Sequence, residues 1–149
     1  LPFIAACLLS IAGCATATGP DLGMTPDGKL SPCPSTPNCV SSDETGSHAI
    51  PPLAISGKPE AAWQALIAHI EAQPRFDIKD REPDYLRAEA RTRLLRFVDD
   101  VEFHLRAGEK QIAMRSASRV GYSDLGTNRR RLESIRQALA EAGVVESGD

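Results

Sequence analysis

Apolar side chains recur at helical spacing in two stretches of the chain. The first stretch begins after Pro59, which suits the first position of a helix, and its apolar stripe is Trp63, Leu66, Ile67 and Ile70. The second stretch runs from about Thr127 or Asn128 to Ala142, is closed by Gly143, and has the stripe Leu132, Ile135 and Leu139. The pattern therefore predicts two amphipathic helices, one before residue 75 and one after residue 126.

Between these stretches apolar and polar residues alternate, which is typical of half-buried strands. Four such segments cover residues 75–80, 85–93, 97–106 and 110–119, and residues 53–55 are compatible with a short edge strand. One face of the four segments is apolar, and the other carries Arg87, Glu89, Asp100, Glu102, His104, Arg106, Arg115 and Arg119. The α-β-β-β-β-α order predicts an α+β fold. We expect a four-stranded antiparallel sheet with the helices on one face and an open, charged opposite face.

The first residues show neither period. Residues 1–13 carry no charge and are too short an apolar run to span a bilayer, which fits an export signal. The run ends in Ile11-Ala12-Gly13-Cys14, which resembles the lipobox of bacterial lipoproteins, where small residues admit the peptidase and the cysteine is acylated. Several acyl chains on one residue give a stable membrane anchor. The alternative, a buried N-terminal helix, is disfavoured because the run has no polar face.

These features divide the chain into three parts. We expect residues 1–13 to be part of a lipoprotein signal peptide, residues 14–31 to hold the lipidated Cys14 and a flexible tether, and residues 32–145 to form a single globular domain. Ala15, rather than an aspartate, follows the cysteine, which resembles lipoproteins of the outer membrane. The sequence thus predicts an exported protein that its lipid holds at the outer membrane, facing the periplasm.

Two further cysteines, Cys33 and Cys39, enclose the short loop CPSTPNC. An exported compartment is oxidising, so a disulfide between them is the leading interpretation. A metal site that adds His48 is the alternative, although the spacing is not usual for zinc and no fourth ligand is evident. We expect a disulfide, no metal site and no cofactor.

The composition limits the classes of partner. The chain has 149 residues, a net charge of −3 and only 5% aromatic residues, so it lacks the positive field and the stacking platforms that nucleic-acid binding uses. The membrane is a partner through the lipid anchor, and the sequence does not identify a protein partner.

Two long stretches resemble a known family. They are LRFVDDVEF (95–103) and RSASRVGYSDLGTNR (115–129), and CPSTPNCVSS (33–42) with His48 is similar to the same family's N-terminal segment. The chain thereby resembles the proteins of domain of unknown function 1499, over roughly residues 30–142. The resemblance implies no established reaction, but it implies export or association with a membrane.

The stretch from Arg115 to Arg131 combines arginines, serines and glycines ahead of the second predicted helix. Such residues near a helix N-terminus suit an anion: a lipid head group, phosphate or a glycan carboxylate. The candidate binding residues are Arg115, Ser116, Ser118, Arg119, Ser123, Asp124, Asn128 and Arg129. A structural interpretation stays open beside this one, in which the arginines pair with Glu89, Asp100 and Glu102 on neighbouring strands and Asn128 caps the helix.

Two details of this region indicate a buried polar network. Ser116 and Ser118 fall on the apolar face of their strand, and Asp99 falls on the apolar face of its own. Because buried polar groups need partners, we expect the serines to reach Asp99 or Asp124 through hydrogen bonds. An arginine is the obvious partner for Asp99.

The function that the sequence favours is a non-catalytic binding or scaffold module for an anionic ligand of the cell envelope. The sequence contains no recognisable Ser-His-Asp spacing, phosphate loop, HExxH or paired-carboxylate motif, so no catalytic residue is assigned. The alternative is a small, hydrolase-like enzyme with a carboxylate, histidine and arginine site on the open sheet face, drawn from Asp99, Asp100, Glu102 and His104.

Overall fold

The computed structural model describes residues 21–148 of the chain. The predicted signal peptide, the predicted lipid site at Cys14 and residues 15–20 of the predicted tether lie outside this part. The described residues form an α+β fold, as the sequence predicts.

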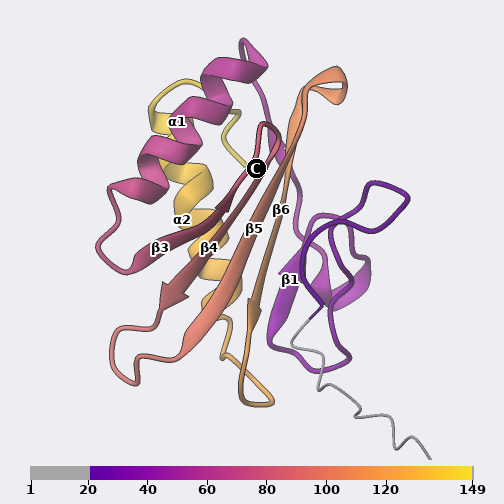
Figure 1. Ribbon diagram of the computed structural model, residues 1–149, viewed down its shortest axis with the longest axis vertical. Helices are drawn as coiled ribbons and strands as arrows, with labels where there is room; N and C mark the ends of the chain where they lie inside the picture. The colour runs from indigo at the N-terminus through magenta and orange to yellow at the C-terminus, as the bar shows by residue number, and fades with distance from the viewer. Residues whose placement is uncertain (1–20, 149) are drawn as a thin grey trace, which may run out of the picture.

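Two helices and six strands make up the described fold (Figure 1). The helices are α1 (Pro59–Glu71) and α2 (Thr127–Glu141). The strands are β1 (Cys39–Ser41), β2 (Leu53–Ala54), β3 (Phe76–Arg81), β4 (Tyr85–Arg91), β5 (Val98–Arg106) and β6 (Gln111–Ser118). Short 3-10 turns, η1 (Gly46–His48) and η2 (Ala107–Glu109), complete the order. Both predicted helices and all four predicted long strands are present, with ends close to the expected ones.

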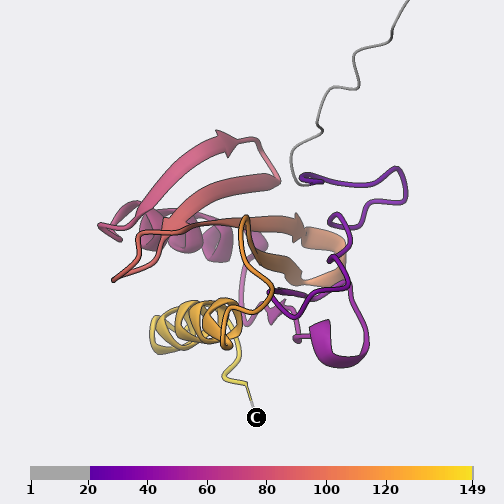
Figure 2. The same cartoon turned by 90° about the horizontal axis from the view of Figure 1, so that it is seen from below.

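The strands form one antiparallel sheet in the order β1-β6-β5-β4-β3, and β2 also pairs with β6. The sheet therefore has more strands than the four predicted. Strand β2 lies within residues 53–55, where a short edge strand was expected, whereas β1 was not predicted, because three residues are too few for an alternating pattern to be seen. Both helices cover the same face of the sheet, as predicted (Figure 2).

The core lies between the helices and the sheet. Helix α1 contributes Trp63, Leu66 and Ile70 and helix α2 contributes Leu132 and Leu139, all at most 3% exposed. They pack on the apolar face of the long strands, whose buried residues include Leu86, Val101, Phe103, Ile112 and Met114. Full burial of one such side chain stabilises the fold by roughly 1.5–3 kcal/mol, so this layer fixes both helices against the sheet.

The opposite face of the sheet is partly covered, whereas the prediction had it open. Residues 21–32, most of which were assigned to the flexible tether, lie against it: Leu30 is 2% exposed, and the backbone N–H of Gly23 donates to the buried Glu102 carboxylate at 2.6 Å. The sequence did not reveal this contact because the segment has no hydrophobic period. Its position depends on polar groups of distant strands.

Cys33 and Cys39 form the predicted disulfide, with Cα atoms 5.7 Å apart. The bond ties the segment before β1 to the edge of the sheet, because Cys39 is the first residue of β1. It also leaves neither sulfur free to ligate a metal together with His48.

Loss of this disulfide should lower the free energy of unfolding by about 2 kcal/mol, because the unfolded chain regains the entropy of a short closed loop. Urea denaturation of the oxidised chain and of Cys33→Ser/Cys39→Ser measures the difference. The wild type in reductant is the control and should match the double variant. An unchanged midpoint would mean that the rest of the fold already restrains this loop.

Candidate functional site

A groove of about 1120 Å³ opens at the end of the sheet where β4 and β6 finish. Its borders include the β4–β5 loop (residues 92–97) and the β6–α2 loop (residues 119–126), which both lie at the lower end of the molecule in Figure 1. This cavity is hereafter the loop groove. It is large enough for a lipid-sized ligand, because ligand pockets commonly enclose roughly 300–1000 Å³.

Apolar side chains of the two loops line the loop groove and stay accessible to solvent. Leu94, Leu95 and Leu125 are 89%, 71% and 83% exposed, and Phe97 and Val120 are about half exposed. Single exposed leucines are ordinary on protein surfaces, whereas several that border one cavity mark a binding surface.

A buried polar network lies beneath the loop groove, at the start of α2. Asn128 is 0% exposed, and its amide oxygen accepts a hydrogen bond from the Ser116 hydroxyl at 2.6 Å. Its amide nitrogen donates to the Ser118 hydroxyl at 2.9 Å and to the Asp124 carboxylate at 2.8 Å. The serines on the apolar face of β6 therefore have the partners that their burial requires.

Asp124, and not Asn128, caps helix α2. The N-cap residue is Gly126, whose φ of 79° lies in the left-handed region that glycine adopts without strain. The Asp124 carboxylate accepts from the backbone N–H groups of Gly126 at 2.9 Å and Asn128 at 2.8 Å. The free N–H groups that an anion would use at this helix end are thus partly occupied by a carboxylate of the chain itself.

Asp99 has the arginine partner that its buried position indicates. It is 1% exposed, and its carboxylate accepts from Nη2 of Arg131 at 2.6 Å. Nη1 of Arg131 donates to Ser116 and Asn128 at 3.0 and 2.7 Å, which joins the ion pair to the polar network. Asp99, Ser118 and Arg131 line the loop groove and form a polar floor in which the charges compensate each other.

The other arginines at this end of the domain differ in their charge environment. In residues 21–148, no carboxylate forms an ion pair with Arg75, Arg93, Arg96 or Arg130. Arg75, Arg93 and Arg130 line the loop groove. The groove therefore combines apolar walls with guanidinium groups whose charge is uncompensated, and guanidinium groups bind phosphate and carboxylate well.

The eight predicted anion-binding residues do not form one cradle. Ser116 and Ser118 point to the helix-covered face of the sheet, whereas Arg115 points to the opposite face and Arg119 reaches carboxylates there. Neighbouring residues of a strand alternate between faces, so the sheet itself separates the arginines from the serines.

The two separated arginines make the cross-strand ion pairs of the structural interpretation. Arg115 donates to Glu102 at 2.7 Å, and Arg119 donates to Asp100 and Glu89 at 2.7 Å each. The hydrogen bond from Arg119 lowers the pKa of Glu89, and the hydrogen bond to Asp100 raises the pKa of Arg119. In these pairs the arginines join neighbouring strands and serve the architecture of the sheet.

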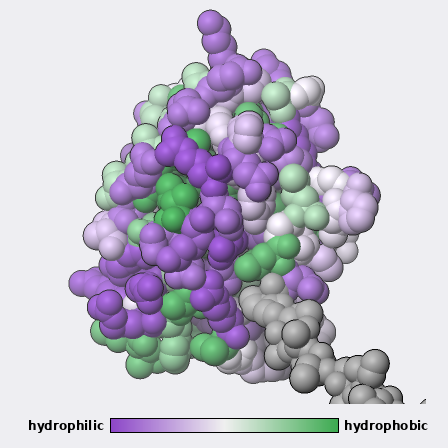
Figure 3. Space-filling view, viewed as in Figure 1, coloured by the Kyte–Doolittle hydropathy of each residue, from purple (hydrophilic) through white to green (hydrophobic). Residues whose placement is uncertain are grey.

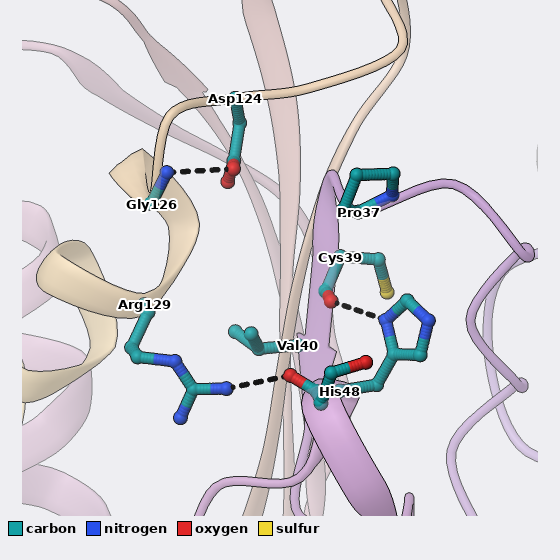
Figure 4. A pocket seen from close by; sticks show the side chains of 8 residues that line it. Pro37, Cys39, Val40, His48, Asp124, Gly126 and Arg129 are labelled. Atoms are coloured by element: carbon teal, nitrogen blue, oxygen red, sulfur yellow. Dashed lines mark hydrogen bonds between the residues drawn. The ribbon is translucent and has the colours of Figure 1, made fainter.

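A smaller cavity of about 120 Å³ lies between the start of α2 and β1 (Figure 4). Asp124 and Arg129 line it together with His48, whose Nδ1 lies 2.8 Å from the carbonyl oxygen of Cys39. Arg129 donates to the carbonyl oxygen of Ala49 at 2.9 Å. The polar side chains that line this cavity are thus hydrogen-bonded to backbone groups. The volume of the cavity is below that of usual ligand pockets, so the loop groove is the stronger candidate.

The charged face of the sheet holds its acids in ion pairs. Asp100 accepts from Arg87 at 3.2 Å and from Arg119, and Glu102 is fully buried. Burial, followed by the positive charge of Arg106, lowers the pKa of the nearby His104. A general base must reach the substrate with a free lone pair. The carboxylates of Asp100 and Glu102 are therefore engaged by arginines in this structure.

Three of the eight predicted anion-binding residues line the loop groove, and the apolar residues that border it were not predicted. Of the predicted residues, Ser118, Ser123 and Asp124 line it. The apolar loop residues Leu94 and Leu95 were missed because they fall in a link between two predicted strands. The available signal was the run TRLLRF, which places leucines where a connecting loop is usually polar.

Comparison with known proteins gives a family and no characterised relative. The family model described as protein of unknown function (DUF1499) matches residues 29–139. No curated protein and no solved structure matches the chain. Within residues 21–148, none of the helices has the length and the apolar character needed to cross a bilayer.

Proposed function

This chain belongs to the DUF1499 family, and we propose that it is a lipid-anchored protein of the cell envelope that binds an anionic amphiphile in the loop groove without chemical change. The proposal keeps the class of function that the sequence favours. It moves the anion site from the strand residues Arg115 and Arg119 to the arginines of the loop groove.

The proposal is carried by one observation, the combination of a large apolar groove with arginines that lack acidic partners. An apolar chain that replaces water along Leu94, Leu95 and Leu125 gains roughly 25 cal/mol per Å² of buried surface. Hydrogen bonds from Arg75 and Arg130 to a charged head group are worth about 1.5–3 kcal/mol each. A simple anion uses only the second contribution and a neutral apolar ligand only the first.

The envelope location is supported by the resemblance of Ile11-Ala12-Gly13-Cys14 to a lipobox. Residues 15–20 separate the proposed lipid site at Cys14 from the described domain, and this stretch can span at most about 25 Å. An anchor of that length keeps the domain near a bilayer, where anionic amphiphiles are abundant.

Binding without chemistry is supported by the groove floor. One oxygen of the Asp99 carboxylate is held by Arg131 in an ion pair at 2.6 Å. Burial lowers the pKa of His69, which lines the groove, and its ring faces Gln73 at 3.5 Å. We assign catalysis to neither residue.

Filling the loop groove should abolish binding of an anionic amphiphile. Ser134 is an exposed residue of α2 that lines the groove, so Ser134→Trp places a bulky ring in the ligand's path. We expect the Kd for monomeric dodecyl phosphate to rise at least about tenfold, measured by titration calorimetry on the full chain with Cys14→Ser to remove the anchor. Gln137→Trp, one turn along the same exposed helix surface and outside the groove lining, is the matched control.

The same titration tests the contributions of the charged head group and of the apolar chain of the ligand. Arg75→Gln/Arg130→Gln should weaken dodecyl phosphate about tenfold or more, because two charge-assisted contacts are lost. Inorganic phosphate and uncharged dodecyl maltoside should each bind at least about tenfold more weakly than dodecyl phosphate. Equal affinity for dodecyl maltoside would refute an anionic ligand, and no binding by the wild type would refute the proposed function.

A further inference from the structure

We infer that the end of the domain formed by the β4–β5 and β6–α2 loops docks on the surface of an anionic bilayer, with the loop tips among the lipid head groups. This inference rests on the proposed function in one respect, because it names the bilayer as the source of the groove's ligand. The docking surface consists of the tips, Leu94, Leu95, Tyr122 and Leu125, and the flanking Arg93 and Arg96.

The tips place large apolar side chains in solvent at one end of the molecule. Leu94, Leu95 and Leu125 are 89%, 71% and 83% exposed, and Tyr122 is 73% exposed. In Figure 3 hydrophobic side chains gather at the lower end of the molecule, where Figure 1 places the β4–β5 loop. Leucine suits the boundary between head groups and acyl chains, and tyrosine suits the head-group level.

The backbone of the β4–β5 loop holds its tip outward. Thr92 closes the loop twice: its N–H donates to the carbonyl oxygen of Phe97 at 2.9 Å, and its hydroxyl accepts from the N–H of Phe97 at 2.9 Å. Arg96 has a φ of 55°, a region that residues other than glycine rarely adopt. Such backbone costs stability, so the hydrogen bonds of Thr92 help to hold the loop in this shape.

The β6–α2 loop is held in the same manner. Leu125 has a φ of 53°, its N–H donates to the Ser123 hydroxyl at 3.2 Å, and its carbonyl oxygen accepts from Arg130 at 2.8 Å. Both tips are therefore preformed in an outward arrangement. A preformed apolar tip loses little conformational entropy when it enters a lipid surface.

Charge selects the partner. Arg93 and Arg96 flank the two leucines in the order Arg93-Leu94-Leu95-Arg96, and neither arginine forms an ion pair within residues 21–148. The chain as a whole has a net charge of −3, so this local excess of positive charge does not follow from composition. Leucines flanked by uncompensated arginines complement a surface that is apolar inside and carries phosphates outside.

A second copy of the chain fits this surface less well. A symmetric contact through the tips would bring Arg93 and Arg96 of both copies together, and like charges at an interface oppose association. An anionic bilayer covers the leucines and supplies the counter-charge at the same time.

Vesicle co-sedimentation of the full chain carrying Cys14→Ser tests the docking surface without the anchor. Wild-type protein should sediment with vesicles that contain phosphatidylglycerol and stay in solution with pure phosphatidylcholine. Leu94→Ser/Leu95→Ser and Arg93→Gln/Arg96→Gln should each lower the partition coefficient at least about tenfold. Thermal unfolding of each variant verifies that it is folded, which is expected because all four side chains are exposed.

Lys58→Gln/Lys110→Gln is the matched control for charge, because it also removes two positive side chains. Lys110 lies in the β5–β6 turn, at the opposite end of β5 from the tips, and its carbonyl oxygen accepts from Ile55, three residues before Lys58. This variant should sediment within about twofold of the wild type.

Three outcomes would overturn the docking surface: tip variants that sediment like the wild type, equal sedimentation with phosphatidylcholine alone, or no sedimentation. A wild-type dimer that Leu94→Ser/Leu95→Ser dissociates would assign the surface to a second copy and also overturn it. The variant Ser134→Trp separates this inference from the proposed function, because it fills the loop groove and should still sediment with vesicles like the wild type. If the protein binds vesicles but does not bind dodecyl phosphate, the docking surface stands and the proposed function is refuted.

Discussion

Replacing Glu102 by alanine should lower the free energy of unfolding by about 3–5 kcal/mol, because it leaves a buried guanidinium without its counter-charge. The Glu102 and Arg115 side chains are 0% and 2% exposed, and their charged atoms lie 2.7 Å apart. The other Glu102 oxygen accepts from the Tyr85 hydroxyl at 2.8 Å and from the N–H of Gly23 at 2.6 Å. The substitution therefore leaves three hydrogen-bond donors without their acceptor. Urea denaturation monitored by circular dichroism measures the loss.

Glu71→Ala is the matched control, because it removes the same side chain from an ion pair of the same length. Glu71 and Arg81 are joined at 2.7 Å, but both side chains are about half exposed. Exposed pairs contribute about 0–1 kcal/mol, so this variant should stay close to the wild type. Equal losses from the two variants would show that burial does not set the strength of these pairs.

A double variant separates the effect of an unpaired buried charge from the effect of lost packing at Glu102 and Arg115. Glu102→Leu/Arg115→Met should recover most of the loss, because apolar replacements of a buried pair are often neutral or stabilising. Nε of Arg115 is already buried without a hydrogen-bond partner, so the native pair is not fully satisfied. If the double variant stays as unstable as Glu102→Ala, the loss comes from Tyr85 and Gly23 instead.

The position of residues 21–32 depends on the same buried cluster of Glu102, Arg115 and Tyr85. Burial and the Glu102 carboxylate raise the pKa of Tyr85, which keeps its hydroxyl protonated and able to donate. Through Gly23 and Glu102 the segment of residues 21–32 is bonded to the centre of the sheet. This explains why a segment without hydrophobic pattern is nevertheless ordered on the charged face.

The parts of the fold that the sequence predicts are those with long local periods. Helix α1 and strands β4 to β6 repeat their apolar positions often enough to identify the buried face. The rule that buried polar groups need partners also predicts the arginine beside Asp99 and the network of Ser116 and Ser118. Segments whose place depends on distant residues, such as residues 21–32 and β1, carry no local signal.

The structure does not bring the eight predicted anion-binding residues together, for a reason that is itself visible in the sequence. Alternation places Arg115 and Ser116 on opposite faces of one strand, so they cannot contribute to a single site. Residues that are close in the sequence of a strand are therefore not necessarily close to one ligand. The loop groove instead joins Leu94 to Leu125 across two loops, and the pairing of strands that brings these loops together is not encoded locally.

Arg131→Met should lower the free energy of unfolding by about 3 kcal/mol, because it leaves the Asp99 carboxylate buried without a counter-charge. The two side chains are 11% and 2% exposed, and Arg131 also supports Ser116 and Asn128. Arg130→Met is the matched control: the same substitution one residue earlier removes an exposed arginine without an acidic partner, and should change stability by less than about 1 kcal/mol. Denaturant unfolding of both variants gives the difference.

Adding Asp99→Asn to Arg131→Met should recover part of the loss, since a neutral amide is less costly to bury than an unpaired carboxylate. A loss from Arg131→Met no larger than that from Arg130→Met would mean that the ion pair between Asp99 and Arg131 does not stabilise the fold.

The result also bears on ligand binding. If the floor of the loop groove is a compensated ion pair, the positive charge available to a ligand comes from Arg75, Arg93 and Arg130 at the groove's sides. An anionic head group would then bind beside the loops, and its apolar chain would follow the leucines.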